Sequence, residues 1–375
     1  MEQRPSELNA LTALRGIAAI LVMCHHFMFV LMPETGFLIP SKFFIKSYLW
    51  VDLFFILSGF VLAYVYHDAF RVDFNGGSYQ RFLQTRFARI YPLHFFCLMF
   101  FVAFEGIQLV LSAFGADGMD NLPVPFTGDE SAETILTNLL LVQTLHWEAY
   151  WNQPAWSISA EWLTYLTLPF LIRWLLPLAK GYFGAIFVVA FTPLILIEWY
   201  FGDLGLNYAG WPMLFRCAGE ATLGILAFRC YQTGAFSGIA NPSYLMPVFV
   251  LNLALLALPI PGVISVAGFA WLVLCAARLP GQKNHVLNHS ILVYLGTVSY
   301  SIYLVHWFFL DILRDSVAFL TGKSVSEAFS LPLQFAIMAA LAVIVLATSH
   351  VTYHRIETPL RARLRPEGKV KRATS

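Results

Sequence analysis

Long apolar runs separated by short polar segments repeat along the whole chain. An α-helix needs about 20 apolar residues to cross the roughly 30 Å hydrocarbon core of a bilayer. The pattern therefore predicts ten membrane-spanning helices, at residues 11–32, 45–66, 90–113, 156–176, 181–200, 211–230, 244–259, 262–279, 291–312 and 334–354. A further apolar stretch, 135–145, is too short to cross and is interpreted as re-entrant or interfacial.

The composition supports a membrane protein. Of the 375 residues, 58% are hydrophobic and 12% are charged, whereas soluble domains carry about 25% charged residues. The first run lacks a small-x-small cleavage site after it, so we interpret it as a membrane helix and not as a signal peptide. We expect one all-α polytopic transmembrane domain over residues 1–375, ending in a basic tail from about residue 355.

Basic residues gather on alternate connecting segments. If both termini lie in the cytoplasm, the inner segments hold most of the Lys and Arg residues, including those of the tail. The long outer segment after the third predicted helix carries Asp117, Asp120, Asp129, Glu130 and Glu133 and no Lys or Arg. This asymmetry predicts cytoplasmic termini. The net charge of +1 predicts no nucleic-acid partner.

Arg15 and His26 are two ionisable residues inside the first apolar run. Their spacing of eleven residues is close to three helical turns, so both side chains leave the same helix face, whereas His25 is rotated off it by about 80°. An ionisable group within a membrane helix costs roughly 2.5 to 3.5 kcal/mol even on lenient insertion scales. The pair is therefore a candidate functional site.

Depth along the predicted helices sorts the polar residues into two layers. The outer half receives His26, Asp52, Glu161, Arg216, Tyr303 and His306. The cytoplasmic layer holds Arg15, Arg86 and Arg89, and the last two share a face if the third helix begins early. Carboxylates and histidines suit proton transfer, whereas guanidinium groups bind phosphate oxygens in pairs.

Each of these residues also has a purely structural interpretation. Arg86 and Arg89 can serve as positive-inside anchors, and His26 can be a hydrogen-bonded interior histidine. Asp52 and Glu161 can pair with Arg216 to hold helices together. Two histidine pairs have the i, i+4 spacing of metal ligands, but neither has a third ligand in the sequence, so we predict no metal site. These pairs are His285 with His289 and His350 with His354.

Six segments in order resemble the acyltransferase 3 family, membrane O-acyltransferases that modify bacterial glycans and some secondary metabolites. They are LTALRGIAAILVMCHHF from Leu11, VDLFFILSGFVL from Val51, RFARIYP from Arg86, WSISAE from Trp156, YSIYLVH from Tyr300 and HRIETPLR from His354. In this family the histidine follows the arginine by eleven residues, which selects His26 over His25.

The resemblance implies acetyl-CoA as a co-substrate that enters from the cytoplasm, with no permanently bound cofactor. Arg15, Arg86 and Arg89 would hold its phosphates, and His26 would act as general base or as an acyl relay. Asp52 or Glu161 would orient the imidazole. Substrate binding or oxyanion stabilisation would involve Arg216, Tyr303, His306 and Ser58.

The resemblance favours an envelope glycan as acceptor, such as exopolysaccharide or lipopolysaccharide, at the bacterial inner membrane. A small cytoplasmic acceptor, such as a macrolide sugar or a nodulation oligosaccharide, is the alternative within the family. From the residues alone, a proton-coupled transporter is the rival class, because intramembrane His, Asp and Glu also form proton relays. The inverted halves typical of transporters are not evident in the sequence.

Overall fold

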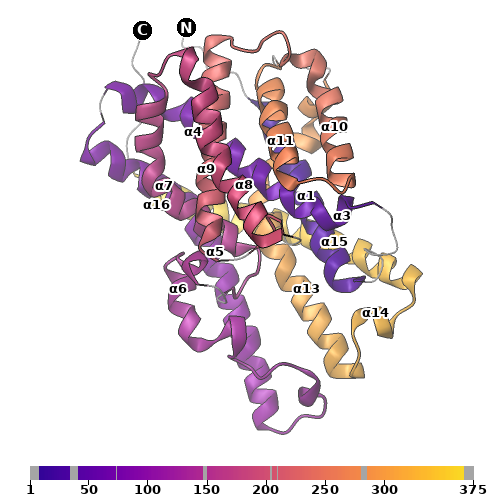
Figure 1. Ribbon diagram of the computed structural model, residues 1–375. Helices are drawn as coiled ribbons and strands as arrows, with labels where there is room; N and C mark the ends of the chain where they lie inside the picture. The colour runs from indigo at the N-terminus through magenta and orange to yellow at the C-terminus, as the bar shows by residue number, and fades with distance from the viewer. Residues whose placement is uncertain are drawn as a thin grey trace.

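The computed structural model describes residues 8–33, 41–72, 74–146, 150–202, 205–208, 210–279 and 285–366, and within them it shows helices and turns but no strands. The helices are α1 (Asn9–Leu31), α3 (Phe43–Lys46), α4 (Trp50–Val72), α5 (Gly76–Ala113), α6 (Ile135–Leu139), α7 (Ala155–Leu175), α8 (Phe183–Phe201), α9 (Pro212–Thr233), α10 (Leu245–Ala257), α11 (Gly262–Ala277), α12 (Ser290–Thr297), α13 (Ser299–Thr321), α14 (Val325–Ala328), α15 (Leu331–Thr352) and α16 (Thr358–Leu364). Figure 1 shows them as one elongated bundle, from which α5 and α13 extend at one end.

All ten predicted spans are helical, but fewer meet the length and apolarity of a membrane span. Five helical segments of the described chain do so, and a sixth is added if the bent pair α12–α13 is counted as one span. Helices α10 and α11 are apolar but short, and α9 carries buried charged residues that lower its hydropathy. The chain is therefore a multi-pass helical protein, while ten spans and cytoplasmic termini stay predictions. The predicted short stretch after residue 134 forms only α6 and a 3-10 turn, Gln143–Leu145.

Helix α5 begins fourteen residues before the predicted start at residue 90. Asn75 caps it, because its side chain accepts from the Ser78 backbone N–H at 2.9 Å while the Ser78 hydroxyl accepts from the Asn75 N–H at 2.9 Å. Such a reciprocal cap satisfies two backbone donors that a helix start leaves free. Because of this early start, both Arg86 and Arg89 are helical, and their three-residue spacing puts the two side chains on one face of α5.

Helices α4 and α9 approach each other backbone to backbone. A Cβ on Gly224 of α9 would lie 2.1 Å from the Ile56 carbonyl oxygen, and one on Gly59 of α4 would lie 2.0 Å from the Ala221 carbonyl oxygen. Small residues allow such contact between membrane helices, where close packing replaces the hydrophobic effect as the attraction. This contact fixes α4, which carries Asp52 and Ser58, against α9, which carries Arg216.

A second close contact fixes α1 against the α12–α13 pair. The axes of α12 and α13 differ by 65°, and at the end of α12 a Cβ on Gly296 would lie 1.8 Å from the Thr12 carbonyl oxygen of α1. A Cβ on Gly16 would in turn lie 2.5 Å from the Gly296 nitrogen. The contact holds α1 beside the start of α13, so the motif with Arg15 and His26 faces the motif with Tyr300 and His306.

Candidate functional site

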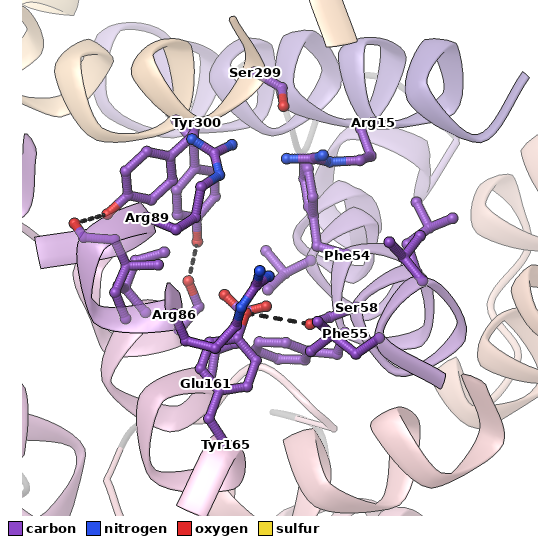
Figure 2. Close-up of a pocket in the computed structure, with 18 residues that line it drawn as sticks. Arg15, Phe54, Phe55, Ser58, Arg86, Arg89, Glu161, Tyr165, Ser299 and Tyr300 are labelled. Atoms are coloured by element: carbon purple, nitrogen blue, oxygen red, sulfur yellow. Dashed lines mark hydrogen bonds between the residues drawn. The ribbon is translucent and has the colours of Figure 1, made fainter. Parts of the chain in front are cut away.

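A cavity of about 130 Å³ lies within the bundle among α1, α4, α5, α7 and α13 (Figure 2). It is large enough for several water molecules, because a cavity needs only roughly 10–15 Å³ to hold one. The polar residues that line it are Arg15, Ser58, Arg86, Arg89, Ser157, Glu161, Tyr165, Ser299, Tyr300 and Tyr303. The three arginines predicted for one cytoplasmic layer therefore line one cavity.

Positive charge predominates in this cavity. Arg15 is attracted by Glu161 and repelled by Arg86, and both of these residues line the same cavity (Figure 2). The Arg86 guanidinium carbon also lies 5.8 Å from the Tyr66 ring centre, within cation–π range, while its Nε is buried without a hydrogen-bond partner among the described residues. Glu161 is the single carboxylate among the residues lining the cavity, so an anion entering the cavity meets excess positive charge.

Arg89 is the arginine whose charge is balanced at the wall of the cavity. It forms an ion pair with Glu357, which is buried and also accepts from the Ser301 hydroxyl at 3.1 Å. Glu357 closes a π-helical turn, Tyr353–Glu357, that joins α15 to α16, and Arg361 lies 3.7 Å from the same carboxylate. Two arginines thus share one carboxylate, which leaves a net positive charge here as well.

His26 lies outside the cavity and pairs with His306. The two rings lie nearly coplanar and edge to edge, with 12° between their planes and 5.1 Å between their centres, and His26 Nδ1 lies 2.8 Å from His306 Nε2. His306 is fully buried, and its Nδ1 lies 3.0 Å from the Ile302 carbonyl oxygen. The edge of Trp307 packs against the His26 ring, with ring centres 5.0 Å apart.

These contacts determine where the protons of the neutral pair reside. A carbonyl oxygen only accepts, so His306 Nδ1 carries the proton and His306 Nε2 is an acceptor. His26 must then donate from Nδ1, so its Nε2 carries the lone pair, which accepts no hydrogen bond from the described residues. A neutral imidazole with a free lone pair is the form that a general base requires.

Tyr303 lies between the histidine pair and the cavity. Its ring centre is 6.0 Å from His306 and 5.9 Å from Phe54, which lines the cavity. Its hydroxyl is already engaged by the Ser157 hydroxyl at 2.7 Å and the Pro154 carbonyl at 3.1 Å. Along α1, His26 is about 16 Å from Arg15 at 1.5 Å per residue.

Among the described residues, no hydrogen bond joins Asp52 to His26, so the structure does not place Asp52 where the predicted orienting role would need it. Both carboxylate oxygens of Asp52 accept from Arg216, one of them from Nε at 3.0 Å, and Glu220 lies 3.6 Å from the same Nε. All three residues are buried. Asp52 thus pairs with Arg216 across α4 and α9, as the structural alternative describes, and a buried carboxylate needs such a counter-charge.

Glu161 and Arg216 also lie apart from the predicted outer layer around His26. Glu161 lines the cavity with the arginines, near Tyr165, whose hydroxyl is 3.4 Å from the Ser58 hydroxyl. Arg216 does not line the cavity, and its Nη1 donates to the Leu206 carbonyl at 2.7 Å. His25, set aside in the sequence, is buried, with Nδ1 2.6 Å from the Phe44 carbonyl oxygen. The predicted outer layer is thus divided among three places: the histidine pair, the Asp52–Arg216 pair, and the cavity that Glu161 and Tyr303 line.

Sequence reasoning missed three residues of these clusters. Glu220 follows Arg216 by four residues on α9, a spacing that places opposite charges on one helix face. Tyr300, whose ring centre is 5.1 Å from the Arg89 guanidinium carbon, and Glu357 both lie in segments already recognised as motifs. The i, i+4 spacing could therefore have identified Glu220, and the motifs could have identified Tyr300 and Glu357.

Comparison with known proteins gives a consistent result. Residues 8–350 match the acyltransferase 3 family, described as an acyltransferase domain. Acyltransferase MdmB of Streptomyces mycarofaciens is 28% identical over 331 residues, which are 82% of this chain and 80% of that protein. Protein 2 in the picA locus of Rhizobium radiobacter is 33% identical over 172 residues, which are 43% of this chain and 81% of that protein. No solved structure matches the chain.

Proposed function

Because this chain belongs to the acyltransferase 3 family and is a membrane acyltransferase, we propose that it transfers an acetyl group from acetyl-CoA to a hydroxyl of an envelope glycan at the bacterial inner membrane. The observation that carries the proposal is the placement of a cationic cavity and a histidine with a free Nε2 along one helix, α1. The cavity suits the phosphates of the donor, and the histidine suits the proton of the acceptor.

The proposed reaction begins with attack of the acceptor oxygen on the thioester carbonyl carbon. His26 Nε2 takes the hydroxyl proton as the new C–O bond forms, the C–S bond then breaks, and the proton passes to the departing thiolate of CoA. In the variant route, the acyl group first bonds to a His26 nitrogen and is then passed to the acceptor. A labelled, acid-labile acyl-protein under single turnover, absent from His26→Ala, would distinguish the relay from direct transfer.

The proposal is tested in liposomes that contain the purified protein, labelled acetyl-CoA and an envelope glycan fraction. We expect labelled glycan together with an equal amount of free CoA. Solute uptake without release of CoA would favour the proton-coupled transporter instead. Mass spectrometry of the envelope glycans from a deletion strain then identifies the acceptor, and unchanged glycans would favour a small cytoplasmic acceptor.

Loss of the cavity arginines is expected to weaken donor binding. Hydrogen bonds to charged groups contribute about 1.5–3 kcal/mol each, so Arg15→Gln and Arg86→Gln should each raise the KM for acetyl-CoA roughly tenfold or more. The KM for the acceptor should not change. Steady-state kinetics with each substrate varied in turn measures both constants.

Arg81→Gln is the matched control for the cavity arginines. Arg81 lies on the same helix as Arg86 but is exposed and does not line the cavity. Its loss tests whether any positive charge near this end of α5 supports binding of acetyl-CoA, or only the charges that line the cavity. An unchanged donor KM in both cavity variants, or an equal rise in Arg81→Gln, would contradict the assignment of the phosphates to this cavity.

His306 is proposed as a positioning residue that fixes the tautomer of His26. In His306→Phe the ring is retained but the acceptor for His26 Nδ1–H is lost, so we expect kcat to fall about 10- to 100-fold with little change in the KM for acetyl-CoA. In His306→Gln the amide oxygen accepts from His26 while the amide NH₂ donates to Ile302, so activity should be largely restored. Equal losses in two folded variants would exclude the hydrogen-bonding role.

A further inference from the structure

A second cavity lies where α4, α7 and α9 end together. Its volume is about 270 Å³, and it is lined by His67, Arg71, Ile172, Arg173, Leu176, Pro177, Arg229 and Gln232. None of these residues lines the first cavity. Three parallel helices thus contribute one arginine each to a hollow that the proposed acyl transfer does not use.

The arginines of this second cavity are only partly matched by protein acceptors. Arg229 Nη1 donates to Gln232 at 2.7 Å, but its Nε is buried without a partner among the described residues. Within the described chain, the Arg71 side chain makes no hydrogen bond or ion pair. The carboxylate next to the lining residues, Asp68, lies 3.3 Å from His67 Nε2. The cavity therefore offers guanidinium donors with little negative charge to meet them.

A purely structural role accounts for one of the three arginines. Arg173 Nη1 donates to the Phe70 carbonyl at 2.9 Å, in the last turn of α4, and its guanidinium carbon lies 5.6 Å from the Phe74 ring centre. Basic side chains commonly satisfy helix C-termini in this way. Within the part of the chain that the structure describes, Arg71 and Arg229 have no such carbonyl partner, although they line the same cavity.

The surroundings place the second cavity at the edge of the bilayer. Its wall includes the apolar residues Ile172, Leu176 and Pro177. Trp174 of α7 and Val72 of α4 lie close by in sequence with exposed fractions of 65% and 66%. Exposed tryptophan beside apolar surface is typical of the membrane interface, where lipid headgroups lie. Basic pockets between helices at this level bind phosphate-bearing headgroups.

From these observations we propose that the second cavity, formed by Arg71, Arg173 and Arg229, binds the phosphate group of an anionic phospholipid. The guanidinium groups of Arg71 and Arg229 supply the main donors for a phosphodiester, and Arg173 adds its charge beside its hydrogen bond to Phe70; all three stay charged at any working pH. The bound headgroup joins the ends of α4, α7 and α9, the helices that also carry Asp52, Glu161 and Arg216.

Native mass spectrometry of the full chain, exchanged from vesicles of phosphatidylcholine with or without phosphatidylglycerol, tests the proposal. We expect wild type to retain one phosphatidylglycerol, and Arg71→Gln with Arg229→Gln to lower its retention at least tenfold. Phosphatidylcholine retention should be the same in both. The matched control is Arg363→Gln, which removes an exposed arginine of α16 that does not line the cavity. Acyl transfer in detergent serves as the check on folding.

The outcomes show separately whether the cavity recognises phosphate and whether that phosphate belongs to a lipid or to a soluble ester. If inorganic phosphate or glycerol 3-phosphate at millimolar concentration displaces the lipid from wild type alone, the arginines recognise the phosphate as proposed. If these soluble probes bind but phosphatidylglycerol does not, the cavity takes a free phosphate ester and the lipid assignment is wrong. Equal phosphatidylglycerol retention in wild type and the double variant, or equal loss in Arg363→Gln, overturns the proposal.

Discussion

Replacing His26 with alanine is expected to lower kcat by about 10²–10⁴-fold, the range that a positioned general base contributes. The free lone pair on Nε2, set by the hydrogen bonds through His306 to Ile302, is the feature that the variant removes. Binding of acetyl-CoA should persist, because Arg15 lies about three helical turns from His26 along α1, and Arg86 and Arg89 lie on α5, with none of the three in contact with His26 among the described contacts. Acyl transfer and donor binding are measured on the same purified protein.

His25→Gln is the matched control for this result. The His25 side chain is buried and meets the Phe44 carbonyl, and a glutamine amide can donate to the same oxygen. This variant should keep most of the activity, because no hydrogen bond or ring contact joins His25 to His306 among the contacts of the described chain. If His25→Gln abolishes transfer in folded protein while His26→Ala retains it, the choice between the adjacent histidines is wrong.

Replacing Arg216 with methionine is expected to destabilise the fold by about 3–5 kcal/mol, the cost of leaving a buried charge without its partner. Arg216 is 1% exposed, and both Asp52 and Glu220 are fully buried beside it. Thermal unfolding in detergent should show a large fall in Tm, or loss of the monodisperse protein. Lysine should not substitute well, because one ammonium cannot pair with both Asp52 oxygens as the guanidinium does.

A double variant separates loss of charge balance from loss of packing. Arg216→Met with Asp52→Asn removes the cation and one carboxylate together, so part of the lost stability should return relative to Arg216→Met alone. The exposed Arg81, replaced by methionine, should change stability by less than about 0.5 kcal/mol. Equal stability of Arg216→Met and Arg81→Met would show that the buried ion pair is unimportant.

The sequence predicted helices well because apolar runs are a local signal. Every predicted span is helical, since each run is long enough to satisfy its backbone hydrogen bonds internally. The 65° bend between α12 and α13 was not predicted, because it follows from close packing of Gly296 on α1, a contact between distant segments. Membrane sidedness rests on the distribution of Lys and Arg alone and stays a prediction.

For the candidate site too, spacing along one helix could be predicted from the sequence, whereas contacts between helices could not. Arg86 and Arg89 lie on one helix, as their spacing predicted, and they line one cavity with Arg15. The spacing could not predict the partner of each group, because depth along a helix fixes height but not direction around the bundle axis. Hence His306, at the same depth as Asp52, is the residue that meets His26, whereas Asp52 faces α9.

The number of residues in the π turn at the end of α15 decides whether the charge of Arg89 is balanced at the first cavity. One residue more or fewer in a helix rotates everything beyond it by about 100°, and the wide turn is what brings Glu357 to Arg89 and Ser301. A relative that lacks Ile356 would keep every charged side chain and still turn this carboxylate away. Arg89 would then lose its carboxylate partner and add a positive charge to the cavity. The cause would be a deletion, with no substitution at any charged position.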